Sequence, residues 1–217
     1  MARLNLSQLA THGDKHPSVN KIDKCEQIIQ GAMAEFLKRG YASTSMDRIA
    51  TAAGVSKQTL YSYFQDKEAL FAAIVERMAS KQIELLFSNA PLEGKPEVVL
   101  REFAIKALTN SMNQPAHLSF MRLMIGESER FPHLTQLFIR SCIQPGIQML
   151  TQYLASHPEL NILDPEATAR IFAGSLIAFI INMEVMHGKH IFPMDSDRLI
   201  DSLIDLLMAR ADTFSPS

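Results

Sequence analysis

Apolar residues recur at intervals of three and four along most of this 217-residue chain, which is the spacing of helices with one apolar face. No run alternates between apolar and polar residues as a half-buried strand does. Several periodic runs begin with proline, where a missing N–H costs a helix little. We therefore expect an all-α protein. The helix-starting prolines are Pro96, Pro115, Pro132 and Pro165, whereas Pro145 falls inside a periodic run and predicts a break there.

Residues 44–67, TSMDRIATAAGVSKQTLYSYFQDK, have the pattern of two short helices joined by a tight turn and followed by the start of a third. Thr44 provides a capping-box-like start for the first of these helices. Gly54 can adopt the left-handed backbone conformation that a tight turn requires. Ser56 and Asp66 are good N-cap residues for the two following helices. This order predicts a helix-turn-helix.

The outward side chains of the second short helix suit DNA, because a helix-turn-helix places that helix in the major groove. Gln58 can bond adenine through its amide, and Lys57 can reach guanine or phosphate. Tyr61 and Tyr63 carry hydroxyls on rigid rings, which suits contacts with phosphate. The alternative is a polar helical corner that contacts a protein partner in a sensor or enzyme that does not bind DNA.

The net charge of −2 is unusual for a DNA-binding protein, but it is unevenly divided. Residues 1–67 carry nine Lys and Arg against six Asp and Glu, whereas residues 68–217 carry twelve against seventeen. The basic share therefore falls with the helix-turn-helix, as a surface that faces phosphate requires.

From Gly40 to Phe71 the sequence GYASTSMDRIATAAGVSKQTLYSYFQDKEALF resembles the DNA-binding domain of the TetR family of bacterial transcriptional regulators. The resemblance extends over about residues 22–75. It implies a homodimeric, all-helical repressor whose second domain binds a small ligand. By position it assigns DNA contacts to Thr44, Ser45 and Arg48 before the turn, to Ser56, Lys57, Gln58, Thr59, Tyr61 and Tyr63 in the recognition helix, and to Lys67 as a phosphate-binding lysine.

These features divide the chain into three parts: a disordered arm (1–17), a helix-turn-helix domain of three helices (18–67) and a C-terminal helical domain for effector binding and dimerisation (68–217). The last two helices of the chain are apolar around more than one narrow face, so they need cover on two sides. A second subunit can supply that cover in a four-helix interface, although burial within the monomer is the alternative. The expected interface residues are Phe172, Leu176, Phe179, Met183, Leu199, Leu203 and Leu207.

The middle helices are expected to enclose the effector pocket, because they contain flexible and polarisable side chains that can adapt to apolar ligands. Ordinary core filling remains the alternative for each residue. Arg122 and Glu127 are candidate polar anchors or surface ion-pair residues. Residues 122–134, RLMIGESERFPHL, also resemble the C-terminal domain of the AefR-like branch of the family. The expected pocket residues are Phe103, Ala107, Phe120, Leu123, Met124, Glu127, Phe138, Cys142 and Met149.

Catalytic signatures are weak. Glu184 and His187 have the spacing of one half of a di-iron site, but such a site needs this motif twice and two further glutamates. His190 could complete a metal cluster, although a solvated loop is the favoured interpretation. No G-x-S-x-G, Walker loop or C-x-x-C is present. We expect no enzyme, no metal and no cofactor; the expected partners are double-stranded DNA, a small-molecule effector and a second copy of the chain.

Two cysteines, Cys25 and Cys142, are too few for a disulfide scaffold, and both fall in apolar helical patterns. Core packing is therefore favoured over redox sensing. Residues 1–20 are polar, and the longest apolar run, 171–181, is too short to span a bilayer. We expect a cytoplasmic protein with no membrane partner. The sequence leaves open whether it represses or activates transcription.

Overall fold

The computed structural model describes residues 18–87 and 92–212, and within these ranges it contains helices and no strand. The expected all-α fold is confirmed. The expected arm, residues 1–17, lies outside the described residues. In chain order the α-helices are α1 (Ser18–Arg39), α2 (Met46–Ala52), α3 (Lys57–Tyr63), α4 (Lys67–Phe87), α5 (Pro96–Met112), α6 (Pro115–Glu127), α7 (Pro132–Phe138), α8 (Gln144–Ala155), α9 (Pro165–Ile180) and α10 (Ser196–Asp212).

The helix starts follow from local sequence. Proline occupies the first position of α5, α6, α7 and α9, where its missing N–H would have had no partner in any case. At the start of α4 the carboxylate of Asp66 accepts a hydrogen bond from the Ala69 N–H, at 2.8 Å. Gly40, with φ of 77°, ends α1 in the left-handed conformation that costs glycine little.

The break expected around Pro145 takes the form of one π-helical turn, η2 (Ile139–Ile143), between α7 and α8. Proline lacks an N–H, and its ring crowds the carbonyl four residues earlier in a regular α-helix. The wider turn, with hydrogen bonds that span five residues, precedes this proline at the start of α8. A second π-helical turn, η4 (Ile181–Val185), follows α9.

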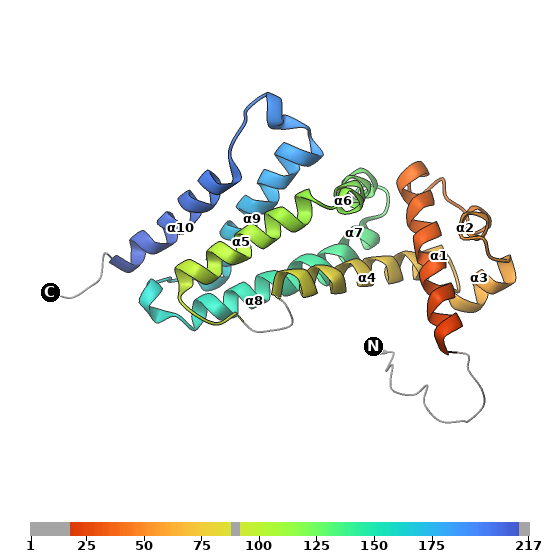
Figure 1. Ribbon diagram of the computed structural model, residues 1–217, viewed down its shortest axis with the longest axis horizontal. Helices are drawn as coiled ribbons and strands as arrows, with labels where there is room; N and C mark the ends of the chain where they lie inside the picture. The colour runs from red at the N-terminus through yellow and green to blue at the C-terminus, as the bar shows by residue number, and fades with distance from the viewer. Residues whose placement is uncertain (1–17, 88–91, 213–217) are drawn as a thin grey trace.

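The helices form an elongated molecule with α1, α2 and α3 at one end and α10 at the other (Figure 1). Helix α4 runs from the first end toward the second. The N-terminal core contains residues of α1–α4 together with Phe120 and Met124 of α6 and Leu134 of α7. The C-terminal core is built from α5, α8, α9 and α10, with Leu118 of α6. Helix α6 therefore contributes to both cores.

Aromatic rings connect the N-terminal core to the middle of the molecule. Phe36 of α1 lies 5.4 Å from Phe71 of α4, and Phe71 lies 5.7 Å from Phe120 of α6. Phe120 in turn lies 5.9 Å from Phe138 at the end of α7. These centroid distances are within the range of favourable ring pairs. We call these four residues the aromatic chain.

The helical segment Pro165–Val185 is long enough and apolar enough to cross a membrane. It is longer than the apolar run seen in the sequence because η4 extends α9. In the structure, 44% of the most apolar window of this segment is buried within the protein. Its buried face carries residues such as Phe172, Leu176 and Phe179 of the C-terminal core. That face therefore packs against the other helices of the C-terminal core.

Candidate nucleic-acid interface and ligand cavity

The turn between α2 and α3 is fixed by local hydrogen bonds. Gly54 has φ of 62°, in the left-handed region expected for it. The Ser56 hydroxyl accepts a hydrogen bond from the Thr59 N–H at 3.0 Å and so caps α3 as expected. The Gln27 amide of α1 donates to the Ala53 carbonyl at 2.6 Å. The turn is thereby fixed to α1, the helix behind it.

Helix α3 has one buried side and one exposed side. Leu60 is completely buried in the N-terminal core, whereas Tyr61 is 51% exposed. Lys57, Gln58 and Ser62 are also exposed, and Tyr63 is half-buried beside Phe64. The exposed side therefore offers an ammonium group, an amide and two hydroxyls on one short helix. These groups can donate to phosphate and to base edges.

Lys57 forms an ion pair with Asp47 of α2, with 2.6 Å between ammonium nitrogen and carboxylate oxygen. Both side chains are more than half exposed. Exposed ion pairs contribute about 0–1 kcal/mol, so the lysine can leave Asp47 for a phosphate at little cost.

The expected role of Thr44 as a helix cap is corrected by the structure. Ser45 is the N-cap of α2, and its hydroxyl accepts from the Arg48 N–H at 3.4 Å. The side chain of Thr44 is only 2% exposed, and its hydroxyl donates to the Gly40 carbonyl at 2.8 Å. Because this hydroxyl bonds inside the protein, Thr44 supports the end of α1.

Lys67, for which a phosphate contact was expected, makes its hydrogen bonds within the protein. The ammonium group donates to the carbonyls of Tyr41 and Thr44, at 2.8 and 2.9 Å, and lies 4.3 Å from the centroid of the Tyr41 ring. Burial lowers the pKa of Lys67, and the nearby charge of Glu127 partly opposes that shift. The lysine is thus turned inward, where it holds the segment between α1 and α2 against α4.

We expect Lys67→Met to lower the free energy of unfolding by about 1–3 kcal/mol, because the half-buried carbonyls lose their donor. The slope of log affinity for duplex DNA against log salt concentration should not change. A lysine that contacted phosphate would instead contribute about one unit to that slope. Urea denaturation and fluorescence anisotropy at several salt concentrations measure both quantities.

Lys57→Met is the matched control, since Lys57 lies on the exposed side of α3. It should reduce the salt slope and leave the free energy of unfolding almost unchanged. If Lys67→Met behaved as Lys57→Met does, the inward role of Lys67 would be wrong.

The end of α6 is joined to the helix-turn-helix by Glu127. Its side chain is 8% exposed, and Oε1 accepts a hydrogen bond from the Tyr41 N–H at 2.8 Å. The same oxygen lies 2.7 Å from the position that a Cβ would occupy at Gly40, so only glycine leaves room for the carboxylate. Glu127 is therefore neither a pocket anchor nor a surface ion-pair residue. It connects the two parts of the molecule.

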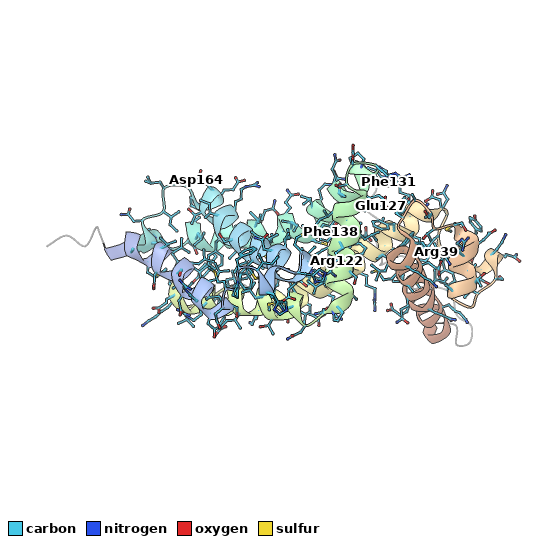
Figure 2. The ribbon with its side chains drawn as sticks, turned by 90° about the horizontal axis from the view of Figure 1, so that it is seen from above. Arg39, Arg122, Glu127, Phe131, Phe138 and Asp164 are labelled. Carbon is cyan, nitrogen blue, oxygen red and sulfur yellow. The ribbon has the colours of Figure 1, made fainter. Side chains whose placement is uncertain are left out.

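Arg122, one to two turns earlier on α6, binds the opposite part. Its guanidinium donates to the carbonyls of Glu184 and Val185 in η4, at 2.6 and 3.3 Å. Figure 2 shows Arg122, Glu127 and Phe138 in the region between the C-terminal helices and the helix-turn-helix. Helix α6 is thus held at one point to the end of α9 and at another to the segment after α1.

A cavity of about 110 Å³ lies among α4, α5, α6, η2, α8 and α9. Four residues expected to form an effector pocket line it: Phe103, Ala107, Phe138 and Cys142. Burial raises the pKa of the Cys142 thiol to about 12, so this cysteine is an unreactive part of the wall. A larger hollow between α8 and α9 is a polar surface groove lined by residues such as Gln148 and Arg170. The apolar cavity is the better ligand site, because it surrounds a molecule with apolar side chains.

The other five expected pocket residues do not line the cavity. Four of them lie on α6, which directs one side toward the cavity and another toward the N-terminal core, and the fifth, Met149, lies on α8. Phe120, Leu123 and Met124 belong to the N-terminal core or pack against it, Glu127 bonds Tyr41, and Met149 packs against the C-terminal core. Several lining residues were not expected from the sequence, including Gln82, Ser111, His117, Met121, Ile147 and Leu176.

The expected dimer residues face the interior of their own monomer. Five of them are buried and two are half-buried against the C-terminal core: Phe172, Leu176, Phe179, Met183 and Leu203, and then Leu199 and Leu207. The exposed residues of the same two helices are different ones. Ile171 is 67% and Leu206 is 70% exposed, and Gly174 and Ala178 are exposed on the Ile171 side of α9. The apolar spacing correctly predicted that one side of each helix is buried. It could not show whether the same subunit or a second one covers that side.

The candidate metal motif is not assembled. Glu184 forms an ion pair with Lys189, at 2.7 Å, and both His187 and His190 are exposed. Within residues 18–87 and 92–212, no cluster of three or more His, Cys, Asp or Glu side chains could hold a metal ion.

Comparison with known families gives two matches. Residues 28–74 match the model described as bacterial regulatory proteins, tetR family. Residues 98–211, more than half of the chain, match the C-terminal domain of AefR-like transcriptional repressors. The first match includes the turn between α2 and α3 and the whole of α3. The second includes most of the residues that line the cavity.

Individual relatives agree with these matches. The uncharacterized HTH-type transcriptional regulator YhgD of Bacillus subtilis is 26% identical over 200 residues, which cover 87% of this chain and 96% of the relative. The flavonoid-responsive regulator FrrA is similar in structure, with a TM-score of 0.69, 29% identity and coverage of 88% and 96% of the two chains. The transcriptional regulator FadR of Bacillus subtilis, solved with stearoyl-CoA, shares the fold with a TM-score of 0.65, 18% identity and coverage of 85% and 98%.

Proposed function

Since the chain belongs to the TetR family of bacterial transcriptional regulators, which are not enzymes, we propose that it is a repressor that binds a palindromic operator as a homodimer. A small apolar or amphipathic effector releases it from DNA. The observation that carries the proposal is the exposed polar side of α3, presented by a capped turn and supported by a buried Leu60. A cytoplasmic protein would meet both DNA and such a molecule.

The proposed DNA contacts are those expected side chains that the fold leaves accessible. Arg48 and Ser45, at the start of α2, would contact the sugar-phosphate backbone of DNA. Gln58 would contact a base edge. Thr44 and Lys67 act indirectly, because they hold the segment before α2 in place. The full proposed set is Ser45, Arg48, Ser56, Lys57, Gln58, Thr59, Tyr61 and Tyr63.

The proposed dimer uses the exposed side of α9, with Ile171, Gly174 and Ala178, together with Leu206 of α10. Two small residues one turn apart allow a partner helix to approach closely. Two subunits related by a two-fold axis would place their α3 helices in successive major grooves, about 34 Å apart. That geometry requires a palindromic operator.

The effector would act through α6 and α4, because both helices line the cavity and extend into the N-terminal core. Phe138, the last member of the aromatic chain, lines the cavity directly. A ligand that displaced Phe138 would press on Phe120 and on α6, and Glu127 would carry that movement to Tyr41. A ligand shifts the equilibrium only by its difference in affinity for the two conformations.

The flavonoid-responsive relative supports an effector of apolar or amphipathic character. The experiment that tests the function is selection of bound fragments from a randomised duplex library by the full-length protein. We expect an inverted repeat among the bound fragments and a steep loss of affinity as salt rises. Recovery of random sequence at low salt, or no duplex binding, would refute the proposal.

We expect Gln58→Ala to reduce discrimination at one base pair of each half-site by roughly 10- to 100-fold, because a bidentate amide contact distinguishes bases by about 1–3 kcal/mol. Anisotropy titrations of the selected operator and of variants changed at single base pairs measure the effect. Gln152→Ala removes an exposed glutamine from α8 and is the control. If the parent protein and Gln58→Ala ranked the operator variants in the same order of affinity and with the same ratios, this base contact would be excluded.

A further inference from the structure

The wall of the apolar cavity contains no formally charged side chain. Of the 17 described residues that line it, none is Asp, Glu, Lys or Arg. The two charged side chains of α6 that the sequence suggested as anchors are both engaged elsewhere. Arg122 donates to carbonyls of η4, and Glu127 accepts from Tyr41. A charged group on a ligand would therefore find no opposite charge in the wall.

The wall does offer hydrogen bonds. Gln82 of α4, Ser111 of α5 and His117 of α6 line the cavity, and Ser111 is only 4% exposed. Within residues 18–87 and 92–212, no protein group hydrogen-bonds the side chains of these three residues, and Gln82 and His117 are half-buried. A ligand that hydrogen-bonds these cavity-facing groups is therefore stabilised relative to an apolar ligand of the same shape.

Ser111 and His117 flank the short connection between α5 and α6, which places two of the three polar groups near one end of the cavity. Burial lowers the pKa of His117, so its imidazole is neutral at neutral pH. A neutral imidazole has one donor and one acceptor, and a hydroxyl has both. The remaining wall is built from side chains such as Phe103, Leu150 and Ile180.

We propose that the cavity selects an uncharged, mainly apolar molecule with a hydroxyl or carbonyl group, and discriminates against carboxylates and organic cations of the same shape. This inference rests on the proposed function and specifies the chemical class of its effector. An ion moved into this wall would lose its hydration without gaining a counter-charge. The discrimination should therefore amount to roughly 100-fold or more in affinity between matched neutral and ionic ligands.

The test uses the full-length protein at pH 7.5 and isothermal titration calorimetry with two matched series. The aromatic series is 2-naphthol, 2-naphthoate and 2-naphthylmethylammonium; the aliphatic series is 1-decanol, decanoate and decylammonium. Stearoyl-CoA is added as a large anion with an apolar chain. We expect at least one neutral compound to bind and its ionic counterparts to bind roughly 100-fold more weakly. Failure of both alcohols to bind, or equal or tighter binding of a carboxylate, an ammonium compound or stearoyl-CoA, would overturn the inference.

A pair of glycine substitutions identifies the site of binding. Gly146 lines the cavity, and a Cβ built there meets no atom within 4 Å, so Gly146→Leu starts its side chain in open space and directs bulk at the ligand site. Gly126 also has open space around its Cβ position and is exposed on α6, which makes Gly126→Leu the matched control. We expect at least about tenfold weaker binding of the neutral ligand by Gly146→Leu only. Equal binding by both variants would place the ligand outside the cavity and overturn the inference.

Affinity for the selected operator, measured on the same samples, separates two failures. Operator binding with a preference for ionic ligands would reject only the inference about charge. Loss of operator binding in the parent protein would reject the proposed function itself.

Discussion

Phe120→Ala is expected to lower the free energy of unfolding by about 3–5 kcal/mol, among the largest effects of any single truncation in the chain. Phe120 is completely buried and lies within ring-pair distance of both Phe71 and Phe138. Alanine would leave a cavity at the place where α4, α6 and α7 meet. Urea denaturation monitored by circular dichroism measures the loss. If the two cores unfold in separate steps, the step of the N-terminal core should shift more, because Phe120 belongs to it.

Phe192→Ala is the control, since Phe192 is 54% exposed and its truncation should change stability by no more than about 0.5 kcal/mol. Phe120→Leu then separates stability from signalling, because leucine fills most of the space without a ring. In that variant operator affinity and ligand affinity should persist, whereas the ligand should release the operator less effectively. A destabilisation below about 1 kcal/mol for Phe120→Ala would show that the ring junction is not tightly packed.

Gly174→Arg is expected to convert the proposed dimer into a monomer and to weaken operator binding by roughly 10²- to 10⁴-fold, because the second half-site no longer binds in the same complex. A Cβ at Gly174 meets no atom within 4 Å in the monomer, so the monomer accommodates the arginine. In the proposed dimer the same side chain would place a large, charged group between two α9 helices. Light scattering after size-exclusion chromatography gives the mass, and anisotropy gives the affinity.

Gly126→Arg introduces the same residue at an exposed helical glycine outside α9. It should leave the mass unchanged and alter operator affinity much less than Gly174→Arg does. A dimeric Gly174→Arg protein with normal operator binding would exclude the exposed side of α9 as the interface.

Local signals made the helix-turn-helix predictable. Gly54, Ser56 and Asp66 determine their turn and caps through atoms within a few residues, and the structure has these caps and the left-handed glycine as expected. The helix-starting prolines were equally informative, because the missing N–H acts at its own position. These features need no knowledge of the rest of the fold.

Features that depend on distant residues could not be obtained in this way. Glu127 bonds Tyr41 across 86 positions of the chain, and Lys67 bonds carbonyls more than 20 positions away. A periodic helix shows that one side is buried but does not identify the neighbour that buries it, which explains why the expected interface residues of α9 are buried within their own monomer. The same limit applies to Phe120. It was expected in the cavity wall, but it lies on the side of α6 that packs into the N-terminal core.

The π-helical turn η2 has a consequence for chain length. This turn accommodates one residue more than regular α-helical spacing requires, while α7 before it and α8 after it each keep their buried sides. Loss of one residue there, together with replacement of Pro145 by a residue that has an N–H, would return the segment to ordinary winding and leave both sides where they are. The same loss in the middle of α5 would turn every later side chain of that helix by about 100°. Evolution can therefore shorten this wall of the cavity by a residue without rebuilding the bundle, a freedom that the straight helices do not have.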